Sequence, residues 1–106
     1  MTQVRYHRLA EEEAAEALDW YESQQQGLGS ELIRELKRAE VAISRSPETW
    51  PIWPETKLEI GIRRFLLSRF PFGVAYIIEN SPIIIAVVHL RRRPLYWLDR
   101  AGDKHS

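Results

Sequence analysis

The chain has 106 residues, no cysteine, and 15 acidic and 15 basic side chains, so its formal net charge is zero. This length fits one domain with its own core, and the lack of cysteine excludes disulfides and thiolate metal sites. The first residues lack the apolar run of a signal peptide, and the longest apolar run, at 83–90, is too short to span a bilayer. We therefore expect one soluble, cytoplasmic domain over residues 1–100 and a flexible C-terminal tail at 101–106.

The charges are divided unevenly along the chain. Residues 1–59 carry 12 acidic and 7 basic side chains, whereas residues 60–106 carry 3 and 8. A uniformly basic chain would indicate nucleic-acid binding. Here only the C-terminal half can present a basic face.

The N-terminal third predicts a short strand followed by two helices. Residues 4–9 alternate between apolar and polar side chains, as a strand does. Apolar residues then recur at helical spacing over 10–26, and the glutamates at 11–13 are expected to form a solvated face in the first turn. After a glycine-containing break, a second helix is expected over 31–44, with a buried stripe of Leu32, Leu36, Ala39 and Ile43. The short connection makes the two helices an antiparallel hairpin.

The segment 47–59 has three prolines and two tryptophans, so we expect no regular structure there. Its tryptophans are too apolar for a free loop. The favoured interpretation is a hydrophobic plug over an edge of the core, and the alternative is an aromatic surface that binds a partner. The candidate partner-binding residues are Trp50, Trp53 and Trp97.

Three apolar runs, at 60–67, 72–79 and 83–91, predict an antiparallel meander. The third run is apolar on both faces, which is typical of a central strand. Pro94 is expected to start a short helix through residues 96–98. The order of elements therefore predicts an α+β domain, in which an N-terminal strand and an αα-hairpin precede a three-stranded meander and a short C-terminal helix. The N-terminal strand can join either edge of the meander, and the edge beside the last strand is favoured.

The end of the third run brings a histidine close to three consecutive arginines. Metal-independent RNA cleavage needs a base, an acid and a cation that stabilises the phosphate. Histidine can exchange a proton near neutral pH, and arginine can hold a phosphate through two hydrogen bonds. If the protein is a nuclease, its candidate catalytic residues are His89, Arg91, Arg93 and Tyr96. The candidates for binding a target or a nucleic acid are Arg64, Arg69 and Arg92.

Simpler explanations of the same residues stay open. The favoured explanation of His89 is a histidine that is hydrogen-bonded to a neighbour at a strand end. Strand alternation places Arg91, but not Arg92, on the same face as His89. No His, Asp and Glu cluster has metal-ligand spacing, and there is no glycine-rich phosphate loop, so we expect neither a metal nor another cofactor.

Taken together, these segments resemble the RelE/ParE family of bacterial toxins from type II toxin–antitoxin modules, which includes plasmid-stabilisation proteins. The resemblance covers essentially the whole chain, and its most specific part is the C-terminal block. Many relatives carry Tyr where this chain has Phe72. The matching residues are Trp20-Tyr21, Leu28-Gly29, Arg64, Arg69-Phe70-Pro71-Phe72, Tyr76, Ala86-Val87-Val88-His89, Arg91-Arg92-Arg93-Pro94, Tyr96-Trp97 and Arg100.

The resemblance implies a toxin that a cognate antitoxin neutralises, and it leaves two activities open. RelE-like members are endoribonucleases that cleave mRNA, typically on the ribosome, whereas ParE-like members inhibit DNA gyrase and thereby growth. The zero net charge favours the ParE-like activity, because a ribosome-dependent nuclease gains affinity from many cations. A third alternative is a non-toxic module that only binds a partner or another copy of itself as a homodimer.

Overall fold

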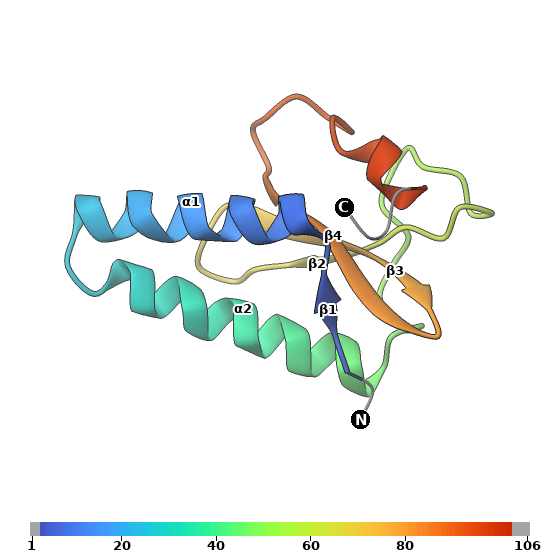
Figure 1. Ribbon diagram of the computed structural model, residues 1–106, viewed down its shortest axis with the longest axis horizontal. Helices are drawn as coiled ribbons and strands as arrows, with labels where there is room; N and C mark the ends of the chain where they lie inside the picture. The colour runs from blue at the N-terminus through green and yellow to red at the C-terminus, as the bar shows by residue number, and fades with distance from the viewer. Residues whose placement is uncertain (1–2, 103–106) are drawn as a thin grey trace.

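The computed structural model describes residues 3–102 and shows an α+β fold (Figure 1). In chain order the elements are β1 (Arg5–Tyr6), α1 (Arg8–Gln24), α2 (Leu28–Arg45), β2 (Arg63–Leu66), β3 (Phe72–Glu79), β4 (Ser81–His89) and the 3-10 helix η1 (Leu98–Ala101). The fold class predicted from the sequence is therefore confirmed. Residues 103–106 of the expected tail lie outside the described residues, and Ala101 ends η1. Within 3–102, no helix is long and apolar enough to cross a membrane.

The helical hairpin begins earlier than the sequence predicted at both of its helices. α1 starts at Arg8 because the His7 side chain caps it, with Nδ1 accepting a hydrogen bond from the Leu9 N–H at 3.1 Å. α2 starts at Leu28 because Gly27 adopts a φ of 95°, which turns the chain at once. The predicted stripe of α2 is confirmed, since its four residues are all buried: Leu32, Leu36, Ala39 and Ile43.

The four strands form one sheet in the order β1-β4-β3-β2. β1 lies parallel to β4, and β3 pairs antiparallel with both β4 and β2. β1 thus joins the sheet beside the last strand, on the edge that the sequence favoured. β2 is shorter than predicted, because it spans only Arg63–Leu66. β4 has the predicted length but lies two residues earlier, at Ser81–His89.

Each face of the sheet carries its own hydrophobic cluster. The helices cover one face, where side chains of α1 and α2 pack on Val74, Tyr76 and Val87. Trp97 lies at the opposite face with Ile62, Ile85 and neighbouring apolar residues. On that side the loop between α2 and β2 lies beside η1 (Figure 1), and the Trp53 and Trp97 rings meet edge to face with centroids 5.0 Å apart. Irregular segments therefore form the second layer.

Candidate binding groove

A groove of about 610 Å³ lies between α1 and the C-terminal end of β4. Its wall and floor are largely apolar, and cations and carboxylates lie at its rim. Three of the residues singled out from the sequence meet here: His89, Arg91 and Arg92. The complete lining is Glu13, Glu16, Ala17, Trp20, Tyr21, Phe72, Val87, His89, Arg91 and Arg92. Within residues 3–102, no group of three or more His, Asp and Glu side chains could hold a metal ion.

His89 and Arg91 are brought together by a turn and not by a strand face. The Arg91 N–H donates to His89 Nδ1 at 3.1 Å, and the Arg92 N–H donates to the His89 carbonyl at 3.0 Å. Strand alternation therefore does not apply to Arg91, and the predicted shared strand face is wrong. The His89 ring also packs edge to face on Phe72, with centroids 5.1 Å apart. One ring nitrogen of His89 is thus already engaged as a hydrogen-bond acceptor.

Tyr96 is held by a carboxylate beside the groove. Its hydroxyl donates to Glu13 Oε2 at 2.6 Å, and the Arg92 guanidinium lies 4.6 Å from the centre of its ring. Burial and the hydrogen bond to Glu13 raise the pKa of Tyr96 above its ordinary value. At neutral pH the phenol therefore stays protonated, and its hydroxyl donates a hydrogen bond to Glu13. Arg93, the remaining candidate for catalysis, is exposed and does not line the groove.

Glu13 is the residue at this site that the sequence analysis missed. Its Oε1 accepts hydrogen bonds from the Val87 N–H at 3.0 Å and from Arg100 at 2.9 Å, and a second Arg100 nitrogen lies 3.2 Å from Oε2. Only 13% of its side-chain surface and 12% of that of Arg100 are exposed. Glu13 does not share the solvated face expected for residues 11–13. The available signal was its spacing, because it lies three residues after the buried Ala10 and four before the buried Ala17.

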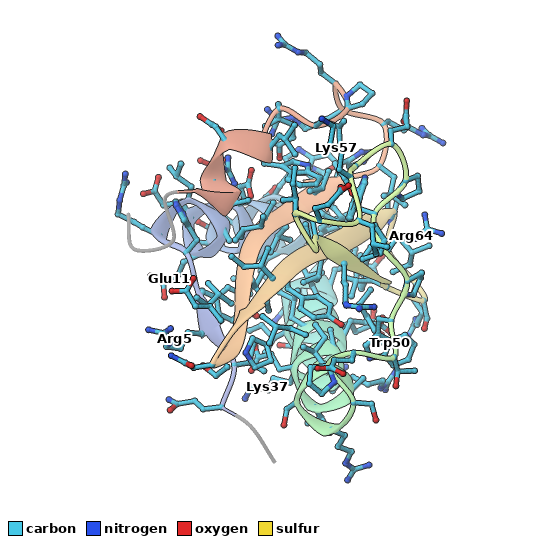
Figure 2. The ribbon with its side chains drawn as sticks, turned by 90° about the vertical axis from the view of Figure 1, so that its right-hand side faces the viewer. Arg5, Glu11, Lys37, Trp50, Lys57 and Arg64 are labelled. Carbon is cyan, nitrogen blue, oxygen red and sulfur yellow. The ribbon has the colours of Figure 1, made fainter. Side chains whose placement is uncertain are left out.

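Two of the predicted target-binding arginines lie away from the groove. Arg64 lines a separate pocket of about 320 Å³ beside Trp50, at the outer edge of β2. Figure 2 shows Arg64 and Trp50 on the same side of the molecule. Arg69 forms an ion pair with Glu31 of α2 at 3.3 Å. Of the three arginines predicted to bind a target, only Arg92 belongs to the groove.

The three tryptophans proposed as partner contacts are involved in packing. Trp97 has no exposed surface, so it cannot contact a partner in this fold, and the prediction for it is wrong. Trp50 donates from Nε1 to the Ala42 carbonyl at 3.2 Å and packs against Phe65. Trp53 covers Trp97. These contacts agree with a hydrophobic plug, and a partner role for the half-buried Trp50 and Trp53 stays a prediction.

Comparison with known proteins shows which fold this is. No protein-family model matches the sequence, and no curated protein matches it. Among solved structures, a chain of the chromosomal ParDE TA system from P. aeruginosa superposes with a TM-score of 0.62. The superposition covers 86% of this chain and 98% of that chain, with 14% sequence identity. At this identity the likeness shows a shared fold.

Proposed function

We propose that this chain is the toxin component of a type II toxin–antitoxin module and that it acts by binding a protein target, such as DNA gyrase. Two observations support a toxin–antitoxin role. The sequence resembles the RelE/ParE toxins over nearly its full length, and the fold is shared with a chain of a ParDE TA system. The target itself is inferred from the resemblance and from the balanced charge of the chain.

The chemistry of the groove carries the choice of binding over cleavage. General acid–base cleavage of RNA needs one group that accepts a proton and another that donates one. The Tyr96 hydroxyl donates a hydrogen bond to Glu13, and the raised pKa of its phenol opposes ionisation at neutral pH. His89 is then the one histidine among the residues that line the groove. An apolar groove with arginines and carboxylates at its rim is instead suited to holding an amphipathic segment of another protein, whose acidic residues would meet the arginines.

The antitoxin is the first partner that the proposal requires. We expect a short, partly disordered chain that folds on binding, as an amphipathic helix or an added strand. Trp20 is 58% exposed and borders the groove, so it offers a large apolar contact beside Arg91 and Arg92. An acidic partner helix could cover all three residues at once. Binding there would block the surface that the target needs.

Induced expression in a bacterial host tests the toxin role, and a supercoiling assay with purified protein tests the target. Growth should stop after induction, and gyrase activity should fall at micromolar protein. Replacing Arg91 and Arg92 together by Ala should restore both growth and supercoiling. Arg45→Ala removes an exposed arginine outside the groove and serves as the control. Unchanged gyrase activity at micromolar protein would reject gyrase as the target, and growth without arrest would favour the non-toxic binding module.

Metal-independent cleavage of mRNA is the second candidate function. It is favoured by one observation, namely that His89, Arg91 and Arg92 share the groove. RNA sequencing after induction should then show new 5′ ends within coding sequences. His89→Ala protein that folds normally should lose these cuts. If that variant stays fully toxic, the nuclease mechanism is wrong.

A further inference from the structure

The edge of β4 loses its neighbouring strand after a very short pairing. β1 pairs with Ile83 and Ile84, and the last backbone bond runs from the His7 N–H to the Ile84 carbonyl at 2.8 Å. The chain then enters α1 and leaves the edge. The next backbone groups of β4 on this edge are met by side chains. Arg100 Nη1 donates to the Ile85 carbonyl at 3.1 Å, and Glu13 Oε1 accepts from the Val87 N–H at 3.0 Å.

These two bonds are the ones that a strand residue would make. In a parallel ladder, one residue bonds to the carbonyl and the N–H on either side of its neighbour on the next strand. Here the neighbour is Ala86, and Arg100 and Glu13 supply the donor and the acceptor. Because both side chains are almost fully covered, water competes little for the bonds. The ion pair thus takes the place of one missing strand residue.

The same carboxylate also reaches the cationic rim of the groove. Glu13 Oε2 accepts the Tyr96 hydroxyl at 2.6 Å, and the Tyr96 ring supports the Arg92 guanidinium at 4.6 Å. We infer that Glu13 is a positioning residue, which closes the edge of β4 and, through Tyr96, holds Arg92 at the groove. The role is indirect, because Arg92 itself has no ion pair within residues 3–102. Its position depends on the tyrosine ring and therefore on the carboxylate that fixes the ring.

Nuclear magnetic resonance of the purified protein, without any partner, tests the contacts that link Glu13 through Tyr96 to Arg92. A guanidinium over an aromatic ring has side-chain protons shifted upfield, and the exposed Arg93 serves as an internal reference. In Glu13→Gln protein, the Arg92 resonances should move towards those of Arg93. Hydrogen exchange at the Val87 amide should accelerate by about tenfold or more, because the Val87 N–H loses its charged acceptor.

Two further variants separate positioning from general destabilisation. Tyr96→Phe keeps the ring and removes only the bond to Glu13, so it should move the Arg92 resonances and leave the Val87 amide protected. Glu12→Gln makes the same charge change one residue away, where the side chain forms an exposed ion pair with Arg8. It should alter neither signal. Arg92 resonances that stay in place in both Glu13→Gln and Tyr96→Phe proteins would overturn the inference.

The functional consequence rests on the proposed function of the groove. If Arg92 contacts the target, Glu13→Gln should weaken growth arrest by about tenfold or more in the inducer concentration required, whereas Glu12→Gln should not. A wild-type chain without toxicity would reject the proposed function and leave the resonance test intact. A toxic Glu13→Gln protein with displaced Arg92 resonances would show that Arg92 is positioned but not used.

Discussion

The two faces of the sheet differ in how their hydrophobic layers are built. The helix face is covered by two long helices, whose buried residues recur at regular spacing along α1 and α2. The opposite face is covered by the loop between α2 and β2 and by the segment that follows β4. These segments have little regular structure. Burial on this face is therefore concentrated in a few large side chains, above all Trp97.

This difference has consequences for stability and for function. A layer made of many medium-sized residues loses one part of its packing when one residue is truncated. A layer centred on one tryptophan loses its central contact. The segment that carries Trp97 also supplies Arg91, Arg92 and Tyr96 at the groove. Packing on the far face therefore contributes to the placement of the groove's rim.

The largest expected effect is the loss of Trp97. Trp97→Ala should lower the free energy of unfolding by about 3–5 kcal/mol, because a fully buried ring is removed and Trp53 loses its partner. Urea denaturation followed by circular dichroism measures the change. Trp20→Ala is the matched control, since Trp20 is mostly exposed and its loss should shift stability by about 0.5 kcal/mol or less. A cost below that of Trp20→Ala would show that the far face is only a peripheral layer.

A truncation on the helix face should lower the free energy of unfolding by less than Trp97→Ala does. Leu32→Ala should lower the free energy of unfolding by about 3 kcal/mol, because Leu32 is fully buried in the hydrophobic cluster of the helix face. The same urea measurement applies. Ile33→Ala, on the exposed side of the same helix, should cost well under half as much. If Leu32→Ala proves more costly than Trp97→Ala, stability is concentrated on the helix face and the contrast between the faces is reversed.

The sequence predicted the helix face much better than the far face. Helical and strand periodicity are local signals, so the stripe of α2 and the bounds of β3 could be read directly. Burial of Trp97 depends on contact with Trp53, which lies in a loop more than 30 residues earlier in the chain. No local pattern records such a contact. Trp97 was therefore assigned to a partner surface.

The same reasoning explains the outcome at the groove. Strand alternation predicted that His89 and Arg91 lie together. They do lie together, but a turn after the strand brings them there. Glu13 was grouped with two exposed glutamates because a run of acidic residues in the first turn of a helix is usually a solvated face. Its partners Val87 and Arg100 lie 74 and 87 residues away. Only the three-dimensional structure brings these groups together.

The hydroxyl of Tyr76 joins the helix-face core to the loop that leads to the far face. It donates to the Pro47 carbonyl at 2.6 Å. Tyr76→Phe removes this bond and keeps the buried ring, so it should lower the free energy of unfolding by about 1 kcal/mol. Thermal unfolding at neutral pH measures the change. A fully neutral substitution would show that the loop is held by Trp50 and Trp53 alone.

The same tyrosine predicts a loss of stability at high pH. Burial raises the pKa of Tyr76 to about 12, and Arg63 opposes this increase. Between its ordinary value of 10.0 and about 12, the unfolded chain releases the phenol proton while the folded chain keeps it. Stability should therefore be unaffected by this group below pH 10 and should fall above it. Tyr76→Phe should make the decline shallower in urea titrations at successive pH values, and an unchanged slope would contradict this origin.

The smallest stability effect is expected at Arg69, beside the helix-face layer. Its ion pair with Glu31 is largely exposed, with 67% of the arginine side chain accessible, so Arg69→Ala should change the free energy of unfolding by about 0.5 kcal/mol or less. Urea denaturation checks the stability, and growth after induction checks the function. Because the fold is hardly affected, a loss of toxicity in this variant would mean that Arg69 contacts the target. The target surface would then extend beyond the groove along α2. Unaltered toxicity would assign Arg69 to the ion pair alone and confine the binding surface to the side of the sheet where β4 ends.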